Sequence, residues 1–144
     1  MKPTFAKEKK ITLTKAKKKA WHEFSIFIRT RDARLTTGGT DNLLCFTCNK
    51  PYPAFGLRCA QAGHFIAGRH AGILFDERGV HGQCYNCNVN LKGNSLVYFR
   101  KMQQMYGDAV IEELEKKDKI DPHYKVNDYL EIYEKYKELN KEGK

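Results

Sequence analysis

Apolar and polar side chains alternate with a helical period along residues 14–33. The positions that recur at three- and four-residue steps are Ala16, Ala20, Phe24, Phe27, Ile28 and Arg31. This spacing places them on one face of a helix. Thr14 is a candidate N-cap, because its hydroxyl can accept a hydrogen bond from a free backbone N–H group. The pattern therefore predicts a helix from about Thr14 to Arg31 or Ala33 with one buried face.

The C-terminal third of the chain repeats the helical period in three segments. The predicted helices are residues 94 or 95 to 106, a short segment from Asp108, and Val126 to about Asn140. Gly107 and Asp121-Pro122 mark the breaks between them. The side chains that we expect to pack are Leu96, Phe99, Met102 or Gln103, Val110, Ile111, Leu114, Tyr129, Tyr133 and Tyr136. We interpret the three tyrosines as a core or interface stripe rather than a platform for stacked bases.

The central part of the chain lacks this helical period. Residues 36–42 form a loop by composition. Residues 58–66 and 73–83 are short, and apolar enough in places, to be the two strands of an irregular hairpin. A flexible and basic connection, residues 67–72, joins them. Helices before and after a small hairpin predict an α+β fold.

Two CxxC pairs enclose this hairpin. Cys45 and Cys48 precede it, and Cys84 and Cys87 follow it. Four thiolates in two such pairs match the tetrahedral sulfur cage of a structural zinc site. Disulfides or a redox pair are the alternatives, and a reducing compartment disfavours disulfides. The fifth cysteine, Cys59, has no partner at ligand spacing, and we expect a buried or spare thiol there.

Length and charge limit the classes of function. The 144 residues fit one domain, which we place at residues 14–144, after a basic and flexible arm at residues 1–13. Lys and Arg number 26 against 17 Asp and Glu, a net charge of +9. This excess favours polyanions such as nucleic acid, although a lysine-rich solvated surface would give the same count. Without an apolar run of about 20 residues or a signal-peptide core, we expect a cytoplasmic protein with no membrane partner.

His64 is the candidate catalytic residue. A histidine beside apolar side chains is by default a satisfied core residue. However, His64 precedes the second cysteine pair by 20 residues, and Asn88 directly follows that pair. A histidine on a hairpin that faces an asparagine on a zinc-anchored helix is the ββα-metal arrangement. In that arrangement the histidine deprotonates water, and the helix residue holds a divalent metal against the scissile phosphate.

Several separated motifs carry a resemblance to a known family. They are Cys45-x2-Cys48, Ala62-Gly63-His64, Phe75-x-Glu77-Arg78, His81-x-Gln83-Cys84-x2-Cys87-Asn88, Gly93-Asn94, and Phe27-Ile28-Arg29-x-Arg31-Asp32 upstream. Together they resemble the phage lambda NinG (Rap) recombination endonuclease family, over roughly two thirds of the chain and as far as about Glu115. The order of the motifs is also similar to phage endonuclease VII. Both belong to the His-Me finger (HNH-like) class.

The resemblance implies a structure-selective DNA endonuclease that acts on Holliday junctions and D-loops as a homodimer. It implies a zinc-anchored ββα-metal core at residues 45–94, flanked by helices before it and at residues 95–140. His64 matches the general base and Asn88 the ligand of a catalytic Mg²⁺ or Mn²⁺. The four cysteines of the two pairs match the ligands of a structural Zn²⁺. No small organic cofactor is expected, and a phage-encoded protein would act in the cytoplasm of its bacterial host.

Two positions depart from the class. Gly63 stands where many members carry an aspartate that is a second metal ligand, and Gly79 replaces the middle asparagine of the HNH pattern. Asp76, Glu77 or His81 could supply the second contact. We favour His81, because it lies on the strand that enters the zinc site; the alternative is a structural histidine beside the zinc.

Six cations are candidate phosphate contacts: Lys15, Lys18, Arg69, His70, Arg78 and Lys92. Two other classes of protein remain open at this point. One is a non-catalytic zinc module that binds nucleic acid, in which His64 and Asn88 are only structural. The other is an interaction protein whose tyrosine-rich terminal helix docks a recombinase or a second protomer.

Overall fold

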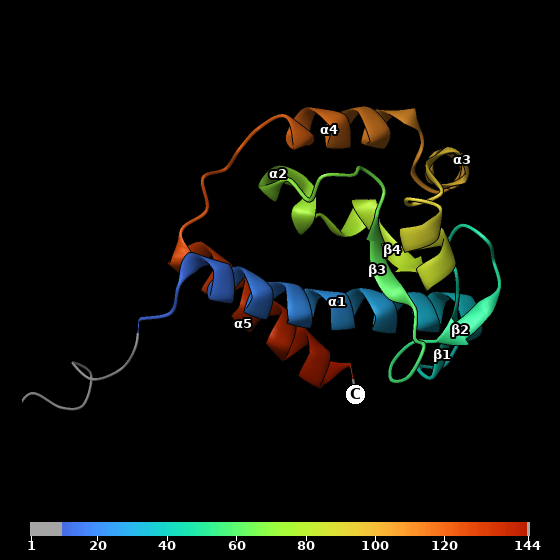
Figure 1. Ribbon diagram of the computed structural model, residues 1–144, viewed down its shortest axis with the longest axis horizontal. Coiled ribbons are helices and arrows are strands. Elements are labelled where there is room, and N and C mark those ends of the chain that lie inside the picture. The colour runs from blue at the N-terminus through green and yellow to red at the C-terminus, as the bar shows by residue number, and fades with distance from the viewer. Residues whose placement is uncertain (1–9, 144) are drawn as a thin grey trace, which may run out of the picture.

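The computed structural model describes residues 10–143 and has an α+β fold, which confirms the expected class (Figure 1). Its elements are α1 (Leu13–Thr37), β1 (Asn42–Leu44), β2 (Pro51–Pro53), β3 (Gln61–His64), α2 (Ala71–Leu74), the 3₁₀ helix η2 (Glu77–Gly79), β4 (Val80–Gln83), the π-helix η3 (Asn86–Asn90), α3 (Ser95–Tyr106), α4 (Asp108–Asp118) and α5 (Val126–Glu142). Most of the predicted arm, residues 1–9, lies outside the described residues. Within residues 10–143, every helix is too short or too polar to pass through a bilayer.

Helix α1 is longer than its sequence pattern predicts at both ends. Its N-cap is Thr12 rather than Thr14, and the Thr12 hydroxyl accepts a hydrogen bond from the backbone N–H three residues later (3.2 Å). At the other end, the hydroxyls of Thr36 and Thr37 donate to backbone carbonyls four residues back (2.6 and 2.8 Å). These two residues therefore extend the helix instead of opening the predicted loop. Gly38 then ends it in the left-handed conformation (φ 82°).

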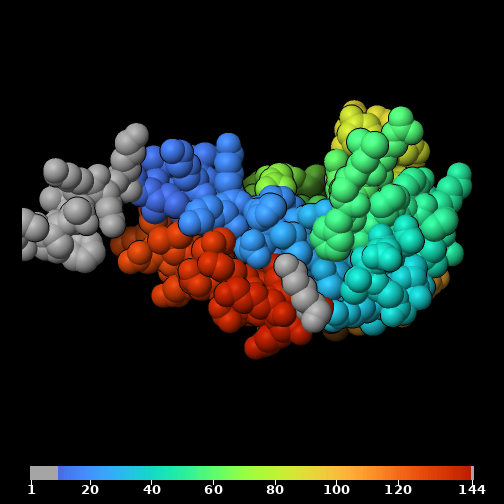
Figure 2. Space-filling model, turned by 90° about the horizontal axis from the view of Figure 1, so that it is seen from below, coloured from blue at the N-terminus to red at the C-terminus, as the bar shows by residue number. Residues whose placement is uncertain are grey.

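Helices α1 and α5 run in the same direction and pack along most of their length (Figures 1 and 2). Near their start, Ala16 and Ala20 pack on Tyr129. Further along, the edge of Phe24 meets the face of Tyr136, with ring centroids 4.9 Å apart. Both tyrosines are buried, and aromatic burial of this kind contributes a large share of core stability. The predicted tyrosine stripe is thus part of the core.

The strands form two separate antiparallel pairs. β1 pairs with β2, and the first cysteine pair lies in the turn that joins them. β3 pairs with β4, with Gly63 opposite His81 and His64 opposite Val80. The hairpin predicted around residues 58–83 is therefore present, but its strands are shorter than expected.

Residues 71–79 form α2 and η2 instead of a strand. Ile73 and Leu74 are buried side by side in α2. Gly72 lies so close to the end of α4 that a Cβ atom there would be 2.1 Å from the Lys117 carbonyl oxygen. Asp76 then caps η2, because its carboxylate accepts a hydrogen bond from the Arg78 backbone N–H (3.1 Å). This close packing against α4 replaces strand pairing along the segment.

The C-terminal helices begin and end near the predicted positions. α3 spans Ser95–Tyr106 and ends at Gly107 as expected. Met102 is buried as predicted, but Tyr98 is buried as well, whereas Leu96 is 66% exposed. The Asn94 side chain does not cap the helix. Its amide instead donates to the Cys87 sulfur (3.8 Å), and this contact fixes the orientation of α3 relative to the cysteine cluster.

Candidate functional site

The four cysteines of the two CxxC pairs come together in space. Their sulfur atoms all lie within 4.8 Å of one another. The sulfurs of Cys48 and Cys84 are 3.8 Å apart, and a tetrahedron with Zn–S bonds of about 2.3 Å has edges of about 3.8 Å. All the cysteines are free thiols rather than disulfides. The cluster therefore fits a structural zinc ion, as the spacing predicts.

Backbone N–H groups are directed at the sulfur atoms of this cluster and stabilise their thiolate form. The amides of Cys48 and Cys84 point at the Cys45 sulfur (3.5 and 3.3 Å), and the Cys87 amide points at the Cys84 sulfur (3.4 Å). Burial opposes ionisation of Cys45, but these N–H groups and the Thr47 hydroxyl lower the pKa of its thiol to about 6. Burial raises the pKa of the Cys48 thiol to about 12. A divalent cation would stabilise all four thiolates together.

The cysteine cluster orients Asn88. Cys84 follows β4 directly, and η3 begins at Asn86, so Cys87 and Asn88 lie in its first turn. The Asn88 backbone N–H donates to the Cys84 carbonyl (2.9 Å). Its side-chain Nδ2 donates to Gln61 Oε1 (2.7 Å) on β3. This bond leaves Asn88 Oδ1 directed toward Gly63, where an oxygen could contact a metal ion.

His64 ends β3 and is held on two sides. Its Nε2 atom is 3.2 Å from the Leu74 carbonyl oxygen, so the tautomer that donates this hydrogen bond leaves Nδ1 as a lone-pair acceptor. Nδ1 has no hydrogen-bond partner within residues 10–143. The ring stacks on Trp21 of α1, with centroids 5.1 Å apart and an interplanar angle of 22°. Burial lowers the pKa of His64 to about 4, so the imidazole is neutral at pH 7.

His64 and Asn88 do not contact each other directly. Asn88 contacts the strand, β3, that His64 ends. Asn88 lies beside Gln61 and Gly63, while the next residue, His64, faces Trp21. Gln61 and Trp21 are contacts that sequence reasoning missed. Nothing in the cysteine and histidine spacing identifies them, because both act across elements distant in the chain.

Gly63 packs so closely against its neighbours that a side chain there would collide with them. A Cβ atom on it would lie 1.9 Å from Gln83 Oε1 and 2.9 Å from Asn88 Oδ1. Gln83 is fully buried, and its Nε2 donates to Thr47 Oγ1 and the Gly93 carbonyl (both 3.0 Å). These two bonds hold the amide against Gly63. Gln83 Oε1 is itself a buried acceptor without a partner among the described residues.

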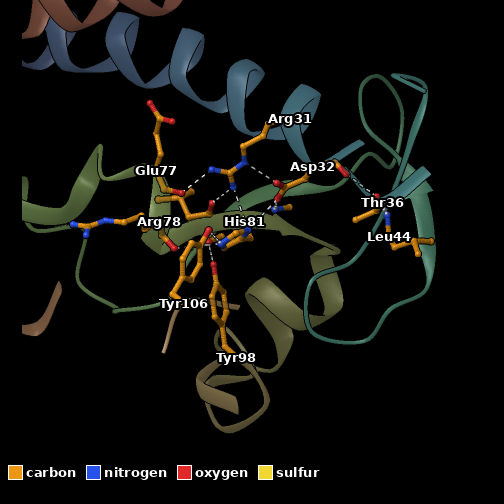
Figure 3. A network of polar contacts seen from close by, with 12 residues as sticks. Arg31, Asp32, Thr36, Leu44, Glu77, Arg78, His81, Tyr98 and Tyr106 are labelled. Atoms are coloured by element: carbon orange, nitrogen blue, oxygen red, sulfur yellow. Dashed lines mark hydrogen bonds and ion pairs between the residues drawn. The ribbon is translucent and has the colours of Figure 1, made fainter. Parts of the chain in front are cut away.

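The structure places His81 in the core, which corresponds to the alternative of a structural histidine. Its side chain is 1% exposed and stacks on Phe46 with centroids 4.0 Å apart. Nδ1 lies 3.1 Å from Arg31 Nη2, and Nε2 lies 3.0 Å from the Tyr106 hydroxyl (Figure 3). Both ring nitrogens are therefore used within the core.

A buried polar network around His81 fixes β4 to α1 (Figure 3). Arg31 donates to the carbonyls of Glu77 and Val80, both at 2.7 Å. Asp32 accepts from the Gly82 backbone N–H (2.7 Å). Burial opposes ionisation of Asp32, but its contacts with His81 and Arg31 outweigh it and lower the pKa of the carboxyl. The network sets the position of β4 and, through strand pairing, that of β3.

The Tyr98 hydroxyl donates to the Gly63 carbonyl (2.7 Å) from a fully buried side chain. We expect Tyr98→Phe to lower the free energy of unfolding by about 1–3 kcal/mol, because a buried carbonyl loses its donor. Denaturant unfolding of the zinc-loaded protein measures this. Tyr85→Phe is the control, since Tyr85 is 56% exposed, and its change should stay within about 0.5 kcal/mol. Equal stability of the two variants would contradict a role for this bond.

The cations expected to contact phosphate have different surroundings. Arg78 is bound by Asp76 (2.8 Å) and Glu113 (3.0 Å), and His70 Nδ1 lies 2.7 Å from Asp118. These two are therefore engaged within the protein. Arg69, Lys15, Lys18 and Lys92 are exposed.

The two alternative metal ligands are also engaged. Asp76 binds Lys117 (2.6 Å) as well as Arg78; despite its burial, these cations hold the pKa of its carboxyl well below the usual range. Glu77 accepts a hydrogen bond from the Tyr136 hydroxyl (2.8 Å). Both carboxylates therefore have partners within the protein.

Comparison with known proteins connects the chain to phage proteins. The sequence model of a family described as "Bacteriophage Lambda NinG protein" matches residues 4–144. "Protein ninG" of Salmonella phage P22 is 33% identical over 105 residues, which are 71% of this chain and 45% of the relative. Its counterpart in Escherichia phage lambda is 32% identical over 101 residues, 68% of this chain and 43% of the relative. The chain thus spans less than half the length of these relatives. No solved structure matches it.

Proposed function

Because the chain belongs to the NinG family, we propose that it is a DNA endonuclease that depends on a divalent metal and cuts branched recombination intermediates. The membership supports a role in phage DNA metabolism, as the resemblance implies. The proposal includes action as a dimer on junction-like DNA in the cytoplasm of the host cell. The nuclease activity itself rests on the site around β3.

The observation that carries the proposal is the environment of His64. One nitrogen is paired with the Leu74 carbonyl, and the other is an open acceptor on a neutral ring. A general base needs this combination of fixed orientation and an available lone pair. Asn88 Oδ1 is directed at the adjacent residue, Gly63. A base and a metal ligand need not touch, since the water, phosphate and metal of the reaction would lie between them.

The proposed reaction is hydrolysis of a phosphodiester bond. His64 Nδ1 takes a proton from a water molecule, which attacks phosphorus in line with the leaving 3′ oxygen. A Mg²⁺ or Mn²⁺ ion held by Asn88 would stabilise the charge that develops on the phosphate and on the leaving oxygen. The leaving oxygen takes a proton from solvent water and His64 returns its proton to solvent, so the products are a 5′ phosphate and a 3′ hydroxyl. A zinc ion held by the four cysteines would keep η3, and hence Asn88, against β3.

A non-catalytic zinc module that binds nucleic acid is the second candidate. It is favoured by the hydrogen bonds of His64 to Leu74 and of Asn88 to Gln61, because both side chains also contribute to structure. The two candidates differ in whether any DNA strand is cut.

The test is incubation of the protein with labelled four-way junctions and with linear duplexes of the same sequence, with Mg²⁺ or Mn²⁺ added. We expect metal-dependent cuts near the branch and slower cutting of the linear duplex. Asn88→Ala should raise the metal concentration for half-maximal rate by about tenfold or more, since an oxygen ligand is lost. Asn90→Ala is the matched control, because Asn90 is exposed on the same short helix.

Binding of the junction without any cutting at either metal would favour the non-catalytic module. Equal metal requirements for the Asn88 and Asn90 variants would contradict the assignment of Asn88.

A further inference from the structure

A groove of about 410 Å³ runs along the N-terminal half of α1. The charged and aromatic side chains that line it are Lys17, Lys18, Trp21, His22, Arg29 and Arg69. Among the residues that the structure describes, no acidic side chain lines it. Cations brought together in a concave surface attract anionic ligands more strongly than the same cations scattered over a convex one.

Four of the lining cations have no counter-ion within residues 10–143, and one of them, Arg29, donates to the Ala54 carbonyl instead (3.0 Å). Lys17, Lys18 and Arg69 form none of the ion pairs of the described chain. Arg78, by contrast, is held by two carboxylates. Burial against neighbouring side chains lowers the pKa of Arg69. A partly desolvated guanidinium without a carboxylate beside it favours an external anion.

His64 does not line the groove, but it contacts Trp21, which does. Arg69 lies over the Trp21 ring, with its guanidinium carbon 4.4 Å from the ring centroid. The same indole stacks on His64 at 5.1 Å. Trp21 therefore contacts both the cation and the candidate base, and an anion bound by Arg69 would lie close to the reacting centre. The lysines lie about one helical turn further toward the start of α1.

We propose that this groove binds the phosphate backbone of one DNA strand beside the bond to be cut. Lys17 and Lys18 hold phosphates away from the cut, and Arg69 holds the phosphate nearest to it. Trp21 is a positioning residue that keeps Arg69 and His64 at a fixed separation. The identity of the ligand as DNA rests on the proposed function, whereas the preference for a polyanion follows from the groove itself.

The chain offers a direct probe, because Trp21 is its one tryptophan. Titration of the intact, zinc-loaded protein with a short linear duplex, or with a four-way junction, in buffer without Mg²⁺ or Mn²⁺ follows binding by tryptophan fluorescence. We expect a saturable change, because a strand in the groove alters the surroundings of the indole. The apparent Kd should rise steeply with salt as phosphate contacts release counterions.

Replacing both Lys17 and Lys18 with alanine should raise the apparent Kd by about tenfold and reduce the magnitude of the salt slope by about 2, one for each lost phosphate contact. Arg69→Gln should also weaken binding, and Arg69→Lys should restore part of it, because the charge returns without the planar stack. Lys116→Ala is the matched control. Lys116 is exposed on α4, and its loss should leave the Kd and the slope unchanged.

The possible outcomes separate this inference from the nuclease proposal. If the protein binds DNA with the expected variant effects but does not cut it when metal is added, the proposal for the groove stands and the nuclease proposal is contradicted. If the protein cuts DNA with metal but its tryptophan fluorescence does not change on titration, or if the double lysine variant binds as the wild type does, the proposal for the groove is contradicted and the nuclease proposal stands.

Discussion

His64→Ala is expected to lower the rate of junction cleavage by a factor of about 10² to 10⁴, the usual contribution of a positioned general base. The structure gives the reason, since His64 Nδ1 is an open acceptor while Nε2 is held by the Leu74 carbonyl. Single-turnover cleavage with the metal at saturation measures the effect. His123→Ala is the matched control, because His123 is exposed and distant in sequence from β3.

The pH profile of the wild-type protein gives a second measure of the same residue. Burial lowers the pKa of His64 to about 4, against 6.5 for an ordinary histidine. The neutral form, which is the active base, persists at pH values above the lowered pKa. The rate should therefore stay level from neutral pH down to about pH 5 and fall as the pH approaches 4. Undiminished cleavage by His64→Ala, or a fall centred near 6.5, would contradict this assignment.

Removal of the zinc is expected to unfold the centre of the protein. Zinc binding to four cysteines contributes on the order of 10 kcal/mol to the folding of small zinc peptides, while whole domains are stable by about 5–15 kcal/mol. Here the four sulfurs join the β1–β2 turn to the end of β4 and to η3. Without the ion, these segments keep only hydrogen bonds such as that from Gln83 to Thr47. Thermal unfolding and circular dichroism, with and without a strong chelator, measure the loss.

A pair of cysteine variants isolates the effect of the cluster. Cys84→Ser should release the zinc and lose the cooperative unfolding transition. Cys59→Ser should bind one zinc per chain and unfold almost as the wild type does, because Cys59 lies outside the cluster. If Cys84→Ser retained the full melting temperature, the zinc would not be structural.

The helices were largely predictable, because each has an apolar face with the helical period. Their ends were less so. The extension of α1 through Thr36 and Thr37 depends on side-chain hydroxyls that bond to the preceding turn, whereas the composition there favours a loop. The buried face of α3 was assigned one step away from Tyr98, because Tyr98 packs on Phe46 and Phe65 from other segments.

The cysteine cluster was predictable from spacing alone, since the type and number of zinc ligands are encoded locally. The role of His81 was not. A histidine on a strand next to a metal site has the same sequence signature whether it binds the metal or a core arginine, and the difference depends on Arg31 and Tyr106, which lie far away in the chain. The same holds for Arg78, whose carboxylate partner Glu113 comes from α4.

The contact between Gly63 and Gln83 has a consequence for how this site can vary among relatives. A side chain at position 63 would collide with the Gln83 amide, which two hydrogen bonds hold in place. An aspartate at position 63 would therefore displace the Gln83 amide and break its two hydrogen bonds, and a smaller residue at position 83 would remove this conflict. The two positions should be inherited as a pair, so that an acidic residue before the histidine and a glutamine before the third cysteine exclude each other across the family.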